Sequence, residues 1–128
     1  MEPAIGVYRP GRCNIGSAEI SRRRRGAWAS TLATVTLYVL LVAIGVPAVA
    51  RFAVALPAAA AAVSWLQVRE RFCVAFGGAG VFNLGPLGRP SPVLAEAARH
   101  ADRRKAASMI ARGALLGLLV GIAVVFVP

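Results

Sequence analysis

Apolar residues gather in long uncharged runs, and strongly basic segments separate these runs. The first run, Ala27–Ala50, contains 24 consecutive residues without a formal charge. At 1.5 Å per residue a helix of this length extends roughly 36 Å, which exceeds the ~30 Å hydrocarbon core of a bilayer. The run therefore predicts a membrane-spanning helix.

Two further runs predict shorter spans. Phe52–Val68 holds 17 uncharged residues and Gly113–Pro128 holds 16, each near the lower limit for crossing a bilayer. Extending the last helix into its polar flank, we expect an all-α membrane protein with three transmembrane helices at about 27–50, 52–68 and 110–127. Arg51 is expected to lie in the first turn, and Pro57 predicts a kink in the second helix.

The polar and breaker-rich segments complete this organisation. Residues 72–88 are uncharged but rich in Gly and Pro, which favours an interfacial or shallow re-entrant segment over a lipid-exposed helix. Ser91 and Pro92 form a helix-start pattern with no Gly or Pro before Gly113, so a cytoplasmic helical stem is expected over 91–112. Residues 1–20 are expected to be an irregular cytoplasmic N-terminus, with a helix beginning near Ser17. Residues 21–128 then form a single helical membrane domain.

The distribution of charge predicts the orientation. The 128 residues are 58% hydrophobic yet carry a net charge of +10. With three spans and a cytoplasmic N-terminus, Arg51 alone among the 15 Lys and Arg residues lies outside. A fourth crossing by residues 72–88 would destroy this positive-inside bias. Three spans are therefore preferred.

The basic clusters are also expected to contact anionic lipid headgroups, at about 1 kcal/mol per residue near the surface. The residues in question are Arg22, Arg23, Arg24, Arg25, Arg103, Arg104 and Lys105. No aromatic stacking platform accompanies this charge, so nucleic-acid binding is not expected. Lys105 is the single lysine, and the richness in Arg, Ala and Gly points to a GC-rich bacterial genome. The expected location is the bacterial plasma (inner) membrane.

Small residues in the spans predict close helix packing. Gly113, Gly117 and Gly121 stand four residues apart and therefore form one row along the third span. The smooth alanine face from Ala58 to Ala62 of the second span is a suitable partner. The row serves either packing within one chain or association between chains.

Candidate chemistry is sparse. Cys13 and Cys73 are predicted to lie on the cytoplasmic side, and the positive charge of Arg69 and Arg71 beside Cys73 favours a reactive thiol if the geometry allows it. Together with His100 these cysteines offer too few ligands for a zinc site. No metal, cofactor or catalytic residue is predicted.

A signal peptide is the alternative interpretation of the first run. Ser21-Arg22-Arg23 is similar to the start of a twin-arginine signal, and Ala48-Val49-Ala50 has the small-x-small form of a cleavage site. Cleavage after Ala50 would release an exported protein. The length of the run and the apolar stretches that follow it favour a membrane anchor instead.

Several short motifs resemble a known family. They are Cys13-Asn14-Ile15-Gly16, Glu19-Ile20, Phe72-Cys73-Val74-Ala75-Phe76 and Gly80-Val81-Phe82-Asn83. Over about residues 13–85 the chain resembles the small two-helix inner-membrane domain of unknown function that accompanies rhodanese-type sulfurtransferases. The resemblance implies a membrane hairpin that associates through its helices, with a structural role for Asn14, Gly16, Cys73 and Asn83 at the cytoplasmic face. It carries over no sulfurtransferase activity, and residues after Arg89 have no counterpart in it.

The sequence thus predicts a structural or accessory integral membrane protein and no enzymatic activity. Its expected partners are the bilayer and either further copies of itself or a larger membrane complex, reached through small-residue helix faces. A thiol-dependent sulfur or redox partner, using Cys73 and Cys13, is the second hypothesis.

Overall fold

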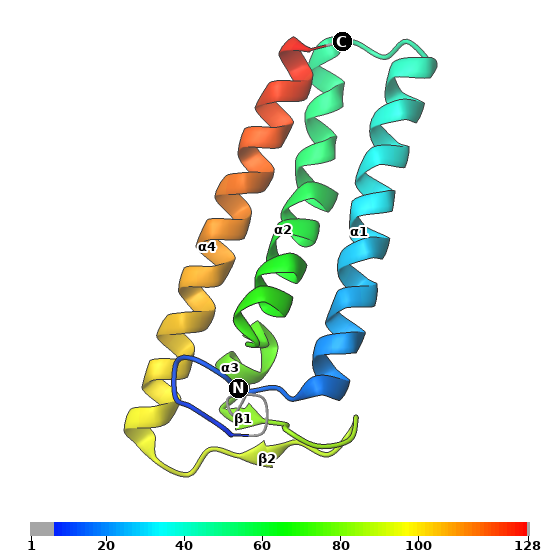
Figure 1. Ribbon diagram of the computed structural model, residues 1–128. Coiled ribbons are helices and arrows are strands. Elements are labelled where there is room, and N and C mark those ends of the chain that lie inside the picture. The colour runs from blue at the N-terminus through cyan, green and yellow to red at the C-terminus, as the bar shows by residue number, and fades with distance from the viewer. Residues whose placement is uncertain (1–6, 128) are drawn as a thin grey trace.

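Three long helices form an antiparallel bundle in which the second helix lies between the other two (Figure 1). The computed structural model describes residues 7–127. The long helices are α1 (Ser17–Ala43), α2 (Ala55–Glu70) and α4 (Glu96–Phe126), and a 3₁₀ helix, η2 (Ala48–Val54), leads into α2. Residues 1–6 of the predicted irregular N-terminus lie outside the described residues.

A short helix and two short strands connect α2 to α4. Helix α3 spans Val74–Ala79, and strands β1 (Val81–Phe82) and β2 (Ser91–Pro92) pair antiparallel, with Val81 opposite Pro92. These elements gather at one end of the bundle with the start of α1, the end of α2 and the start of α4 (Figure 1). We call this the basic end, and the opposite end, with residues 44–54 and the end of α4, the distal end.

Each of the three helical segments is long and apolar enough to cross a membrane: Ser17–Ala43, Ala48–Glu70 and Glu96–Phe126. Large apolar side chains such as Leu32, Leu56 and Leu115 are more than half exposed along these helices. An apolar exterior of this kind is stable only in an apolar surrounding. The chain has the build of a multi-pass membrane protein, as the three-span prediction required.

The first hairpin turns earlier than predicted. Helix α1 ends at Ala43 rather than near Ala50, because Gly45 adopts a positive φ of 74° just beyond it and Pro47 follows. Arg51 lies in η2 instead of in the turn. Its guanidinium donates hydrogen bonds to the carbonyls of Val124 and Val125, at 2.7 and 3.1 Å, so it binds the C-terminal end of α4.

The predicted start of the last helix is wrong. Ser91 and Pro92 belong to β2, and the last helix begins at Glu96. Pairing with β1 holds Ser91 and Pro92 in an extended conformation, which overrides the local helix-start pattern. Pro57, which was predicted to kink the second helix, lies in the first turn of α2. The N–H that proline lacks is not needed for an intrahelical hydrogen bond there.

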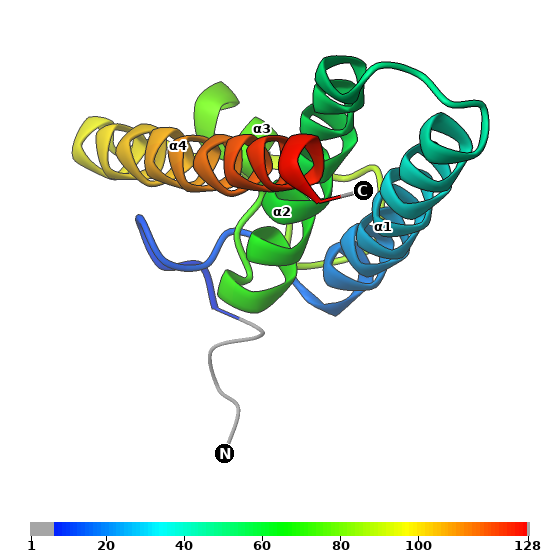
Figure 2. The ribbon, with the colours of Figure 1, turned by 90° about the horizontal axis from the view of Figure 1, so that it is seen from above.

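From Glu96 onward the predicted stem and third span form one continuous helix, α4. Residues 72–88, predicted to be interfacial, fold as α3, β1 and the turn that follows, and they remain at the basic end (Figure 1). Viewed along the bundle, α4 and α1 flank α2 on different sides (Figure 2).

Candidate functional site

Polar side chains meet in the interior of the basic end. Asn14, Glu19, Cys73 and Asn83 are each at most 2% exposed. They come from the segment before α1, from α1, from the start of α3 and from the residue after β1. We call these four residues and Arg23 the polar cluster, and it is the candidate functional site.

Asn14 holds the start of α3. Its Nδ2 donates to the Cys73 carbonyl at 3.2 Å, and its Oδ1 accepts from the Cys73 N–H at 2.7 Å. One amide side chain thus satisfies both backbone groups of a buried residue, as a strand neighbour would. The backbone N–H of Asn14 donates to the Arg71 carbonyl at 3.2 Å.

Asn83 holds the loop after β1. A parallel bridge joins Ile15 to Asn83, with hydrogen bonds of 2.9 Å from Gly16 N–H to the Asn83 carbonyl and from Asn83 N–H to the Asn14 carbonyl. The Asn83 amide donates to Glu19 Oε2 at 3.1 Å and to the Pro86 carbonyl at 2.8 Å. These contacts join the segment before α1, α1 and the loop after β1 at one residue.

Gly16 allows the loop to approach this closely. A Cβ atom at this position would lie 2.4 Å from the Leu84 carbonyl oxygen, which belongs to the backbone. Only glycine fits without moving the loop. Gly16 also precedes the first residue of α1 in the capping position.

Glu19 brings a buried negative charge into the cluster. Its Oε1 lies 3.1 Å from Arg23 Nη1 and 3.3 Å from Arg22 Nη2, one helical turn further along α1. The carboxylate also lies in the first turn of α1, where the helix dipole favours negative charge. The two arginines therefore neutralise the charge that folding buries.

Arg23 links this carboxylate to the cysteine. Its Nη2 donates to Cys73 Sγ at 2.8 Å, and its guanidinium carbon lies 5.5 Å from the centre of the Phe76 ring. The sequence predicted Arg69 and Arg71 beside Cys73 and missed Arg23. The i, i+4 spacing of Glu19 and Arg23 on one helix face indicates their ion pair but not the contact with Cys73.

Asp102 anchors the N-terminal segment to α4. It is fully buried, accepts from the Tyr8 hydroxyl at 2.6 Å and accepts from the Gly11 N–H at 2.6 Å. Burial, followed by the hydrogen bond and the charge of Asp102, raises the pKa of Tyr8 above its ordinary value. The Tyr8 ring stacks on Phe82 with 4.6 Å between ring centres. The segment before α1 is thus fastened to both β1 and α4.

Both predicted thiols are inaccessible. Cys13 is 3% exposed and Cys73 is 2% exposed. Burial raises the pKa of the Cys13 thiol, and the Ile15 backbone and the charges of Arg71 and Arg9 oppose that effect. Within residues 7–127 no three His, Cys, Asp or Glu side chains are placed to share a metal ion.

Some of the residues predicted to contact headgroups form ion pairs within the chain, and the others are exposed. Lys105 belongs to the first group, and it shares its partner with Arg112, for which no headgroup contact was predicted. Lys105 and Arg112 both pair with Glu70 at the end of α2, and Arg112 does so with two hydrogen bonds of 2.7 and 3.0 Å. Arg22 and Arg23 pair with Glu19, as described above. The exposed arginines Arg24, Arg25, Arg103 and Arg104 project from the basic end.

The glycine row lies inside the chain, against α2. A Cβ at Gly113 would lie 2.3 Å from Val63 Cγ2, one at Gly117 2.5 Å from Ala59 Cβ, and one at Gly121 2.7 Å from Ala55 Cβ. The facing residues therefore recur every fourth position of α2, and Ala59 among them belongs to the predicted alanine face from Ala58 to Ala62. Ala58 is buried and Ala62 is half-buried.

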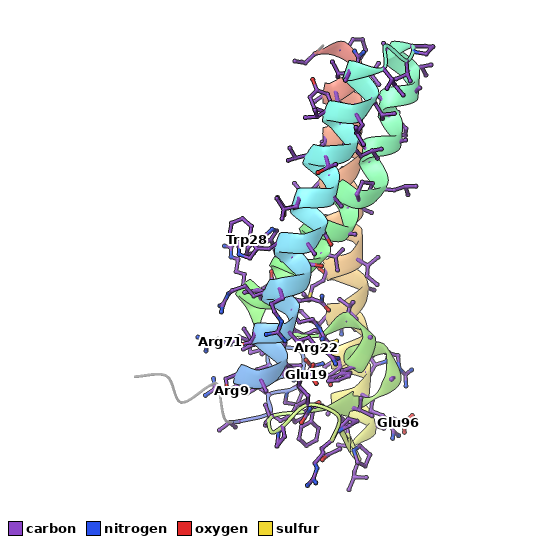
Figure 3. All side chains as sticks on the ribbon, turned by 90° about the vertical axis from the view of Figure 1, so that its right-hand side faces the viewer. Arg9, Glu19, Arg22, Trp28, Arg71 and Glu96 are labelled. Atoms are coloured by element: carbon purple, nitrogen blue, oxygen red, sulfur yellow. The ribbon has the colours of Figure 1, made fainter. Side chains whose placement is uncertain are left out.

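The polar cluster holds several chain segments together at the basic end. Its donors and acceptors contact each other and the backbone, and α1, α3 and the loop after β1 meet there. Figure 3 shows Glu19 pointing into this region while Arg9 and Arg71 lie at its margin. No family model, curated protein or solved structure matches this chain.

Proposed function

We propose that this protein is a structural or accessory protein of a bacterial inner membrane, with its basic end on the cytoplasmic side. It holds three helices in a fixed arrangement and associates with further copies of itself or with a larger membrane complex. It performs no catalysis.

The segregation of charge carries the proposal. All Lys and Arg residues except Arg51 belong to the basic end or to the half of α4 and α1 next to it. Short loops rich in Lys and Arg stay in the cytoplasm. The orientation follows, with the N-terminal end of α1 inside and the C-terminal end of α4 outside.

The polar cluster supports a structural role. Side chains that act on a substrate need to reach it, whereas Asn14 and Asn83 use their amides on neighbouring segments of the same chain and Glu19 Oε2 accepts from Asn83. Such fully buried networks specify one arrangement of the elements they join. The cluster fixes how the loop between α2 and α4 closes the bundle.

Association must use faces other than the glycine row. Gly113, Gly117 and Gly121 pack against α2, so the surfaces left for partners are the outer faces of the bundle, among them those of α1 and α4. Both faces carry exposed large apolar residues, including Val35 and Leu119.

The mass of the protein, extracted together with the lipid that surrounds it, tests the association. The protein is extracted together with its surrounding lipid by a membrane-solubilising polymer, and the mass of the protein component is measured. We expect a particle that contains several 13.3 kDa chains or other proteins as well. A particle with a single chain and no other protein would contradict the proposal.

One contact favours the thiol hypothesis as a second candidate. The hydrogen bond from Arg23 to Cys73 Sγ brings the positive charge of the guanidinium group next to the sulfur. The burial of Cys73 opposes this hypothesis, because a partner needs access to the thiol. Rapid labelling of Cys73 in the folded protein would support it.

A further inference from the structure

A cavity of about 290 Å³ lies at the basic end, between the start of α1 and the end of α2. Three arginines, Arg24, Arg69 and Arg71, and two serines, Ser17 and Ser21, line it. Ser17, Ser21 and Arg24 are spaced four and three residues apart, so they lie on one face of α1. Arg69 and Arg71 come from the last turn of α2 and the residue after it.

The cavity has a strongly positive lining. Among the described residues that line it there is no carboxylate. The two acidic residues closest to it in the sequence are engaged with other cations, since Glu19 pairs with Arg22 and Arg23 and Glu70 pairs with Lys105 and Arg112. The guanidinium groups of Arg24 and Arg69 beside one space favour a bound anion.

The other residues that line the cavity indicate which kind of anion fits it. Guanidinium groups match phosphate oxygens with paired hydrogen bonds, and serine hydroxyls add single donors. Ile20 and Val68 supply an apolar wall, and Ile20 is buried against the Cys73 side of the core. A ligand with a phosphate group and an apolar body satisfies both parts of the lining.

We propose that this cavity binds the phosphate group of an anionic membrane lipid. The site lies where two spans emerge from the apolar bundle, at the depth of a headgroup if the basic end faces the cytoplasmic leaflet. In this respect the inference rests on the proposed function. It goes beyond general headgroup attraction because it assigns the binding to one cavity and to Arg24, Arg69, Ser17 and Ser21.

Lipid retention by the purified protein tests the site. The protein in a mild detergent is titrated with phosphatidylglycerol or with phosphatidylcholine, and bound lipid is measured by native mass spectrometry. We expect preferential retention of phosphatidylglycerol. The double variant Arg24→Gln/Arg69→Gln should weaken it by about thirtyfold, on the scale of two headgroup contacts. In detergent both ends are accessible, so this result does not depend on the orientation in the membrane.

A matched control removes the same charge elsewhere. Arg12→Gln/Arg89→Gln lowers the net charge by two at exposed positions outside the cavity, and it should change retention less than threefold. Ser21→Leu keeps every charge but fills the cavity from an exposed position, and it should weaken retention as the arginine variant does. This variant keeps the test valid if the arginine variant does not fold.

The remaining outcomes are decisive as well. Equal losses in the two double variants would overturn the site, because net charge alone would then explain binding. Equal retention of phosphatidylcholine and phosphatidylglycerol would overturn it too. Displacement of the lipid by millimolar inorganic phosphate would support binding of a phosphate group in the cavity. It would overturn the assignment of that group to a lipid, because the ligand would then be a soluble phosphate.

Discussion

Asn14 shows how one side chain can determine a local arrangement. Its amide satisfies the N–H and the carbonyl of Cys73, which lies 59 residues further along the chain. Once the amide is removed, the Cys73 N–H loses its hydrogen bond, whereas the Cys73 carbonyl still accepts from the Gly77 N–H at 2.9 Å. Each buried backbone group left without a partner costs about 1–3 kcal/mol.

Asn14→Ala should therefore loosen the start of α3. We expect the local free energy of opening to fall by about 1–3 kcal/mol, so that maleimide labels Cys73 about tenfold faster or more. Peptide mass spectrometry of the labelled protein separates Cys73 from Cys13. In the unchanged protein, labelling of both thiols should be slow because both are buried.

Ser108→Ala serves as the control, since it removes a polar group at an exposed position of α4. It should leave the labelling rate unchanged. If Asn14→Ala labels no faster than the unchanged protein, the Asn14 amide does not hold α3.

At this scale the sequence identifies residue types better than partners. Gly16 and the glycine row are visible as glycines, and the arginine clusters are visible as charge. The contact of Arg23 with Cys73 joins residues 50 positions apart, and local periodicity contains no information about such a pair. The same holds for Asp102 and Tyr8, whose interaction depends on where the loops close.

The elements follow from the sequence more directly. Long uncharged runs predict helices because a helix satisfies its own backbone in lipid. The errors are at the ends. Gly45 ends α1 before the apolar run ends, and pairing with β1 makes Ser91 part of a strand. Both depend on contacts or dihedral angles that hydropathy does not report.

The contact between α2 and α4 depends on the missing side chains of the glycine row. Gly117→Leu should lower the free energy of unfolding by about 1–3 kcal/mol, because its Cβ alone would lie 2.7 Å from the backbone of Ala59. Unfolding in mixed detergent micelles, followed by circular dichroism, measures the change.

Gly26→Leu is the matched control, because Gly26 is also inside a helix but has nothing within 4 Å of its added Cβ. It should retain the stability of the unchanged protein or exceed it, since leucine favours helix more than glycine does. A Gly117→Leu variant as stable as Gly26→Leu would refute close packing of α4 on α2.

At the scale of the whole molecule, polarity is organised along the bundle axis. The polar cluster, the ion pairs of Glu70 and the arginine-lined cavity all lie at the basic end. At the distal end Arg51 binds the last carbonyls of α4, and the Tyr38 hydroxyl donates to the Val127 carbonyl at 3.2 Å. The number of helices long and apolar enough to cross a membrane and the position of the charge could be predicted from sequence, whereas the contacts within the basic end required the structure.

The accessibility of single cysteines in intact bacterial cells tests the central claim most directly. Val49→Cys and Val127→Cys place exposed thiols at the distal end, and Ser91→Cys places one at the basic end. The unchanged protein is the control, since its two cysteines are buried. A maleimide that crosses the outer membrane but not the inner membrane should label Val49→Cys and Val127→Cys in intact cells, and Ser91→Cys only after the inner membrane is opened. Labelling of Ser91→Cys in intact cells, or protection of either distal position, would contradict three spans with a cytoplasmic basic end.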